Sequence, residues 1–195
     1  MDSLWRSTCS IPAYPSLKAP MEVEVAVLGG GLCGLLTAYF LKEAGKEVVV
    51  LESGRILSGA TEGTTAKITA QHGLIYDRLI ARRGEAQARS YAQAQTRAIA
   101  HYERLVRHLA ISCGFSRLPA YLYSVAPSLA LERECRAAER LGLAASLTGA
   151  SKLPLPAAQA LRFDEQAQFH PLRFGAEIAK RLTIREQSRV TQVQP

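Results

Sequence analysis

The sequence predicts an α/β protein that opens with a βαβ unit, and three features of residues 22–52 carry this prediction. An apolar run from Val23 to Leu28 is typical of a buried parallel strand and leads directly into a glycine-rich turn. A helical segment follows and stops at Gly45, as it would at a C-cap glycine. A second apolar run, Val48 to Leu51, predicts the next parallel strand.

The turn between the first strand and the helix has the spacing G-x-G-x-x-G, which indicates a Rossmann-like dinucleotide-binding unit. Gly29 permits the tight turn, and Gly31 lets the backbone approach a pyrophosphate, with Gly30 between them. Gly34 lets the helix lie close on the strand. The free N–H groups and the positive end of the helix dipole would then face the phosphates.

An acidic residue follows the second strand. Glu52 lies about 20 residues beyond the glycine turn, where Rossmann-like proteins place a carboxylate that accepts hydrogen bonds from a ribose. The uncharged stretch Val25–Leu41 could alternatively be a membrane span. Three consecutive glycines in its middle and a Lys-Glu pair directly after it argue against that reading. The sequence therefore favours a nucleotide site and predicts no transmembrane segment.

The composition is that of a globular protein and argues against some functions. Of its 195 residues, 48% are hydrophobic and 21% are charged. The formal net charge is +7, but the arginines are dispersed and not clustered with aromatic residues, so we expect no nucleic-acid partner. The four cysteines show no metal-ligand spacing, which predicts no metal site and a reduced, cytoplasmic protein.

Beyond Glu52, helical and extended patterns alternate. Ser53–Thr69 is a loop rich in Gly, Ser and Thr, too long and too polar for a simple connection, and such loops are usually functional. The further elements that we expect are helices at Tyr76–Arg82 and Glu85–Leu109, a strand at Tyr121–Val125, a helix capped by Ser128, an irregular stretch over 146–170, a helix at Pro171–Leu182 and a strand at Thr183–Val193. Three clear strands leave an unfinished sheet edge, so the chain looks like the front portion of a larger fold.

Four segments of the chain resemble one known family. They are SLWRSTCSIPAYPSL, VAVLGGGLCGLLTAYFLKEAGKEVVVLE, SGATEGTTAKITAQHGLIYDRL and LRFDEQAQFHPLRFGAEIAKRL. Together these segments resemble the FAD-dependent oxidoreductases of the D-amino-acid oxidase type, and among them a bacterial branch often fused to a C-terminal Rieske domain. The glycine unit is shared by many flavoproteins, whereas the TTAK-x-T-x-QHG loop is much more specific to this branch.

The resemblance implies a discontinuous FAD-binding domain with an inserted α+β substrate domain, apparently truncated. We expect an extended N-terminal arm over residues 1–20, an incomplete FAD-binding domain over 21–75 and 171–195, and part of the substrate domain over 76–170. Such enzymes continue well beyond this length, and the chain contains no C-x-H…C-x-x-H pattern for a Rieske cluster.

The resemblance also implies a set of cofactor contacts. The glycines would face the pyrophosphate and Glu52 the adenosine ribose, with Ser53 and Arg55 near the adenine end. Thr64, Thr65 and Ala66 would pass the flavin ring, and the backbone of Val190 would contact adenine. Lys67 and His72 are weak candidates for a catalytic role near the ring, with ordinary loop structure as the alternative. The implied FAD contacts are Gly29, Gly30, Gly31, Gly34, Glu52, Ser53, Arg55, Thr64, Thr65, Ala66 and Val190.

As a function, the resemblance implies oxidation of a C–N or C–O bond in an amine, amino acid or related small molecule. A hydride would pass to the flavin, and the electron acceptor and exact substrate stay open. One alternative is a truncated, catalytically inactive fragment. Another is an NAD-binding protein, since the glycine motif and Glu52 suit NAD equally, but NAD would not need the long TTAK loop. A flavoenzyme acting on RNA would use the positive charge, yet no basic and aromatic patch supports it.

Overall fold

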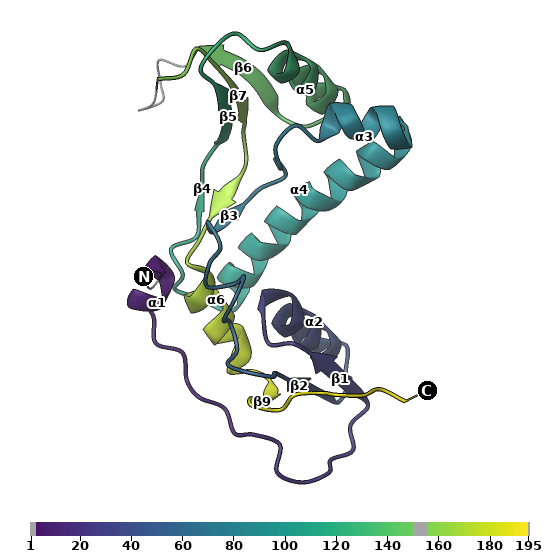
Figure 1. The fold of residues 1–195 in the computed structure, drawn as a ribbon, viewed down its shortest axis with the longest axis vertical. Coiled ribbons are helices and arrows are strands. Elements are labelled where there is room, and N and C mark those ends of the chain that lie inside the picture. Colours follow the sequence, from purple (N-terminus) through teal and green to yellow (C-terminus); the bar gives the residue numbers. More distant parts are fainter. Residues whose placement is uncertain (1–2, 150–155, 195) are drawn as a thin grey trace. The chain divides into compact units, whose positions relative to one another are not determined.

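The computed structural model describes residues 3–149 and 156–194, and it divides the chain into two compact units (Figure 1). The first unit comprises residues 1–66, 110–113 and 170–195, and the second comprises 67–109 and 114–169. Both combine helices and strands. Among the described residues, no helix is long and apolar enough to cross a membrane.

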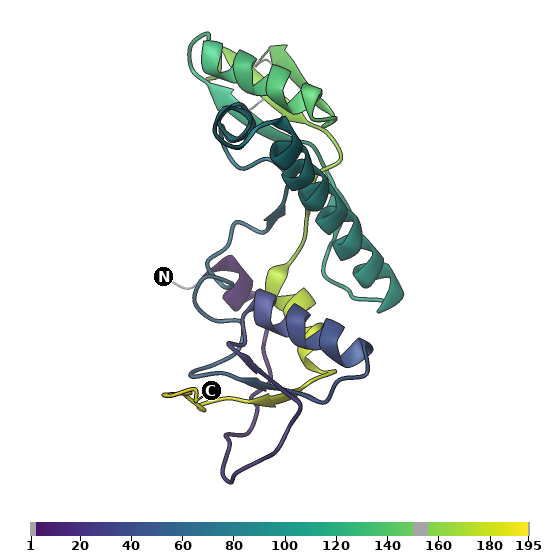
Figure 2. The ribbon, with the colours of Figure 1, turned by 90° about the vertical axis from the view of Figure 1, so that its right-hand side faces the viewer.

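The first unit is built on a parallel sheet with the strand order β1-β2-β9. Its strands are β1 (Val25–Leu28), β2 (Val48–Leu51) and β9 (Thr183–Arg185), and the register pairs Val25 with Val48 and Val49 with Thr183. Two helices, α2 (Leu32–Glu43) and α6 (Pro171–Ala179), lie on the same side of this sheet (Figures 1 and 2). The predicted βαβ unit is therefore confirmed, and the crossover from β2 to β9 contains the whole second unit.

Glycines set the geometry of α2 at both of its ends. Gly29 adopts φ +104°, and a Cβ on Gly34 would overlap the carbonyl oxygen of Gly29, so the helix lies directly on the end of β1. At the other end Gly45 adopts φ +82° and donates its N–H to the Lys42 carbonyl, while Lys46 donates to Leu41. This pair of bonds is a Schellman C-cap, as the sequence predicts.

The N-terminal arm was expected to be extended, but it begins with one helical turn, α1 (Leu4–Ser7). The Ser3 hydroxyl accepts the Arg6 N–H and so caps the turn. From Thr8 to Pro20 the arm runs without helix or strand before it reaches β1 (purple in Figure 1).

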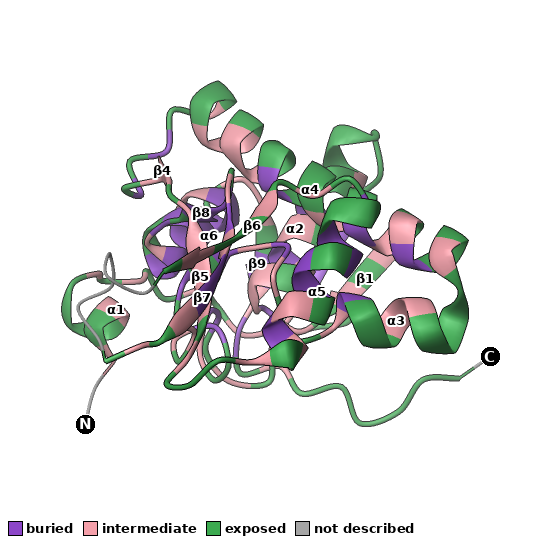
Figure 3. Ribbon diagram, turned by 90° about the horizontal axis from the view of Figure 1, so that it is seen from above, coloured by how far each residue is buried: buried purple, intermediate pink, exposed green. Residues whose placement is uncertain are grey.

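The second unit packs helices on an antiparallel sheet. Its elements are α3 (Tyr76–Arg83), α4 (Glu85–His108) and α5 (Leu129–Arg140), a sheet of β5 (Ala120–Ser124), β7 (Gln159–Phe163) and β6 (Ala145–Gly149), and a smaller sheet of β3 (Lys67–Ile68), β8 (Ala167–Gln168) and β4 (Ser116–Arg117). Tyr76, Leu131, Leu161 and Phe163 lie in its core. In Figure 3, α4 and α5 each carry buried residues along one side and exposed residues along the other. Their apolar faces hold the unit together.

Two expectations about secondary structure are wrong. The stretch 146–170, expected to be irregular, contains β7, β8 and most of β6. Leu161 pairs with Leu122 on one side and Leu147 on the other, and such pairing between distant strands leaves little local signal. The expected strand Thr183–Val193 ends at Arg185, because Gln187 adopts φ +51° and turns the backbone out of the sheet.

A buried carboxylate joins α5 to α3. Glu134 is 0% exposed, and its two oxygens accept the N–H groups of Ile75, Tyr76 and Asp77 at 2.8–3.0 Å. These donors form the open N-terminal end of α3, where the helix dipole also favours a negative charge. One side chain therefore satisfies three backbone groups that the helix itself cannot pair.

We expect Gly34→Ala to lower the free energy of unfolding by about 3 kcal/mol or more, because the new Cβ would overlap a backbone carbonyl that cannot rotate away. Gly63→Ala is the matched control, since its Cβ would stand 3.5 Å from the Gly59 carbonyl, an ordinary contact. Urea unfolding followed by circular dichroism measures both variants. Equal losses in the two would contradict the close approach of α2 to β1.

We expect Glu134→Ala to cost about 2–4 kcal/mol of stability, because three backbone N–H groups lose their acceptor in a buried site. Glu132→Ala on the same helix removes only an exposed pair with Arg136 at 3.9 Å and should cost less than about 1 kcal/mol. Chemical denaturation compares the two. A Glu134 variant as stable as the Glu132 variant would show that water replaces the cap.

Candidate nucleotide-binding site

The N-terminal end of α2 presents open backbone donors next to one donor that a side chain already occupies. Gly31 is the N-cap residue, and the Leu32 N–H donates to the Thr61 hydroxyl at 3.3 Å. Within the described part of the chain, the N–H groups of Cys33 and Gly34 have no acceptor. A Cβ on Gly31 would stand 3.3 Å from the Thr61 oxygen, so glycine keeps this end of the helix open. Donors of this kind, with the helix dipole behind them, bind anions such as phosphate.

Glu52 lies at the carboxyl end of β2 and already accepts three hydrogen bonds. Its Oε2 accepts the Gly30 N–H at 2.7 Å, and its Oε1 accepts the Gly54 N–H at 2.7 Å and the Ser53 hydroxyl at 3.1 Å. Burial by itself raises the pKa of Glu52, but the donors from Gly30, Gly54 and Ser53 together lower that pKa below its usual value. Since a carboxylate has about four acceptor positions, one on Oε2 stays available for a ligand hydroxyl.

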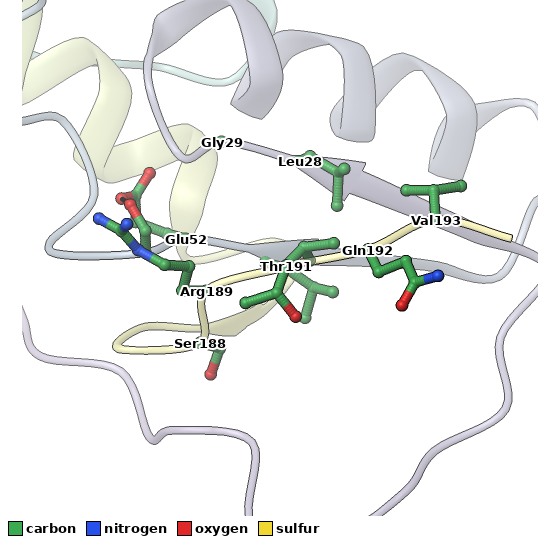
Figure 4. A pocket seen from close by; sticks show the side chains of 11 residues that line it. Leu28, Gly29, Glu52, Ser188, Arg189, Thr191, Gln192 and Val193 are labelled. Atoms are coloured by element: carbon green, nitrogen blue, oxygen red, sulfur yellow. Dashed lines mark hydrogen bonds between the residues drawn. The ribbon is translucent and has the colours of Figure 1, made fainter.

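A pocket of about 470 Å³ opens at the carboxyl ends of β1 and β2 (Figure 4). It is lined by Leu28, Gly29, Leu51, Glu52, Ser53 and the segment 188–193. In the view of Figure 4, Glu52 and Arg189 mark one end of this pocket and Val193 the other. Open α/β sheets bind ligands at this edge. Four of the eleven residues expected to contact the cofactor, namely Gly29, Glu52, Ser53 and Val190, line this one pocket.

A second carboxylate, Glu186, supports the same edge and was missed by the sequence analysis. It is 1% exposed, follows β9 as Glu52 follows β2, and accepts the Ile56 N–H at 2.8 Å and the Tyr14 N–H at 3.0 Å. Arg55 pairs with it at 3.2 Å. Because the strand was expected to run over Thr183–Val193, Glu186 lay inside it, and no pattern marked this residue as a carboxylate at a strand end. Arg55, expected near adenine, is thus held by Glu186 and by the arm.

The expected flavin-side segment forms a tight turn at the end of the first unit. The Thr64 hydroxyl accepts the Ala66 N–H at 3.3 Å, and buried Ala66 adopts φ +59°. The Thr64 carbonyl accepts the indole N–H of Trp5 at 2.8 Å, and Thr65 is exposed. A non-glycine residue at positive φ costs about 1 kcal/mol and needs such support from its surroundings.

The two candidate catalytic residues belong to the second unit. Lys67 lies exposed on β3, and the Nδ1 of exposed His72 is 3.2 Å from the Tyr91 hydroxyl. The nucleotide site of the first unit is therefore built without them, and their roles stay predictions. Among the residues that the structure describes, no group of three His, Cys, Asp or Glu side chains could hold a metal ion.

The donors, the carboxylate and the pocket together fit the adenosine diphosphate part of a dinucleotide. The open N–H groups of α2 suit a pyrophosphate, the free acceptor position of Glu52 suits a ribose hydroxyl, and the pocket has room for a base. By this test the residues present fit FAD, whose non-flavin half has this chemistry.

Comparisons with known proteins agree with this geometry. A family model described as "FAD dependent oxidoreductase" (DAO) matches residues 24–195. The chain is 36% identical over 175 residues to the putative Rieske 2Fe-2S iron-sulfur protein YhfW of Bacillus subtilis, a match that covers 89% of this chain and 34% of that protein. The chain thus spans about a third of the length of this relative.

Among solved structures, L-amino acid deaminase from Proteus myxofaciens superimposes with a TM-score of 0.70 at 14% identity, covering 96% of this chain and 42% of that one. Glycine oxidase from Bacillus cereus superimposes with a TM-score of 0.68 at 18% identity, covering 89% of this chain and 48% of that one. At these identities the likeness establishes the fold. The family match over nearly the whole length, together with the curated relative, shows that the chain belongs to the DAO family of FAD-dependent oxidoreductases.

Proposed function

We propose that the protein containing this chain oxidises the C–N bond of an amino acid or a related amine with FAD as its cofactor. The observation that carries the proposal is the open N-terminal end of α2 beside the Glu52 pocket, because it supplies an anion site and a ribose acceptor at one sheet edge. The names of the structural relatives, a deaminase of L-amino acids and a glycine oxidase, support amino-acid-like substrates.

In this proposal each part of the first unit has one task. The N–H groups of Cys33 and Gly34 hold the pyrophosphate, Glu52 holds the ribose, and Val190 lines the adenine end of the pocket. The Thr64–Ala66 turn borders the flavin end. When bound, FAD supplies the two-electron acceptor for the substrate, and the chain's own residues bind and orient it.

The experiment for this function uses the whole protein, purified and incubated with FAD. We expect a yellow protein whose visible flavin absorbance is bleached anaerobically by at least one member of a panel of amino acids and simple amines. A parallel incubation with NADH tests the other dinucleotide. A preparation that stays colourless with FAD yet retains NADH would refute the proposal, and FAD binding without bleaching by any amine would refute its substrate class.

We expect Glu52→Gln to weaken FAD binding by about 1–3 kcal/mol, since the amide cannot accept the Gly30 and Gly54 N–H groups together and loses the charge that strengthens a ribose bond. Glu22→Gln is the matched control, because it makes the same substitution at an exposed carboxylate that does not line the pocket. Titration of flavin fluorescence gives the two affinities. Equal affinities for both variants and the wild type would disprove the placement of the ribose at Glu52.

A further inference from the structure

Residues 3–17 of the N-terminal arm are fastened to the first unit, beginning with the loop that follows β2. Trp5 donates its indole N–H to the Thr64 carbonyl at 2.8 Å, and its ring packs edge-on against His170 with centroids 5.0 Å apart. Arg6 pairs with Glu62 at 2.5 Å. The arm therefore holds loop 58–66 at two positions, Glu62 and Thr64, that are two residues apart.

Further along, the arm is tied to the edge of the sheet. Arg55 donates to the carbonyls of Ile11 and Pro12 at 3.1 Å, and Glu186 accepts the Tyr14 N–H while donating its own N–H to Pro15. These bonds involve backbone groups of the arm and fix its course past the loop.

The same loop touches the phosphate end of the nucleotide site on its other side. Thr61 is buried, and its hydroxyl accepts the Leu32 N–H in the first turn of α2. Thr61 is the direct neighbour of Glu62 and lies three residues from Thr64, the two anchor points of the arm. The loop is thus held between the arm and the anion-binding end of the helix.

We infer that the arm is a strap that retains FAD, with Trp5 as a positioning residue that acts through the Thr64 carbonyl. Trp5 itself does not line the Glu52 pocket; its indole N–H fixes the loop whose Thr61 hydroxyl binds the first turn of α2. This inference rests on the proposed FAD site and adds to it a segment that contributes none of the expected cofactor contacts.

The strap is separable from the fold, because discrete polar bonds and the ring contact between Trp5 and His170 attach it. A pocket of about 680 Å³ lies between arm residues 6–11 and loop residues 55–62, so continuous packing does not join them there. Trp5 is half-buried and Arg6 is exposed. Loss of one such bond should loosen the loop without unfolding the unit.

The test is Trp5→Phe in the whole, FAD-loaded protein. Phenylalanine keeps an aromatic ring beside His170 but removes the donor to Thr64. We expect FAD release, followed by the rise of free flavin fluorescence after dilution, to become about five- to tenfold faster, the factor for one lost hydrogen bond. The FAD-free protein should stay folded, with a thermal midpoint lowered by no more than a few degrees, as one lost hydrogen bond implies. Tyr14→Phe is the control, since Tyr14 bonds to Glu186 through its backbone N–H, which the substitution keeps.

The outcomes separate the strap from the cofactor assignment. A wild-type protein that holds FAD and a Trp5 variant that releases it at the wild-type rate would overturn the strap alone, whereas a wild-type protein without FAD affinity overturns both. If the Trp5 variant does not fold, tryptic digestion of the wild-type protein tests the strap instead. Because coupling is reciprocal, bound FAD should slow tryptic cleavage after Arg6, and equal cleavage with and without FAD would overturn the strap.

Discussion

Two carboxylates at the ends of neighbouring parallel strands hold the functional edge of the first unit together. Glu52 follows β2 and binds the glycine turn through Gly30, while Glu186 follows β9 and binds the loop through Ile56 and the arm through Tyr14. Parallel strands bring their carboxyl ends to one edge, so both side chains reach the same loop. Buried backbone N–H groups without an acceptor would be costly there. The shape of the glycine turn, the loop and the arm therefore depends on these two charges.

The second unit uses the same device for a purely structural purpose. Glu134 accepts three N–H groups at the start of α3, far in sequence from the strand ends that carry the other two carboxylates. A carboxylate bound to backbone donors is thus no sign of a ligand site by itself. What distinguishes Glu52 is its position on an open pocket and the acceptor capacity that its internal bonds leave unused.

The parts that were predictable are those whose signal is local. The glycine spacing, the two Val-rich runs and Glu52 lie within one short segment, and Ser128 and Pro171 mark the helix starts as expected. In the central sheet of the second unit β5 was expected, but β6 and β7 depend on pairing between strands distant in sequence, so their short runs looked irregular. Glu134 and Glu186 were missed because a lone acidic residue gives no pattern; only the structure reveals which backbone groups surround it.

The interrupted course of the first unit affects how the protein is made. Val49 of β2 pairs with Thr183 of β9, and the nucleotide pocket needs both Leu28 and residues 188–193. During synthesis the ribosome therefore releases the glycine turn long before the residues that complete its pocket. The second unit comprises residues 67–109 and 114–169, so it is almost one continuous stretch of chain. It can fold in the meantime, because domains fold as units while the chain emerges. The nascent chain thus passes through a stage in which β2 can pair with β1 but has no partner on its other edge, where chaperones or wrong strands can bind.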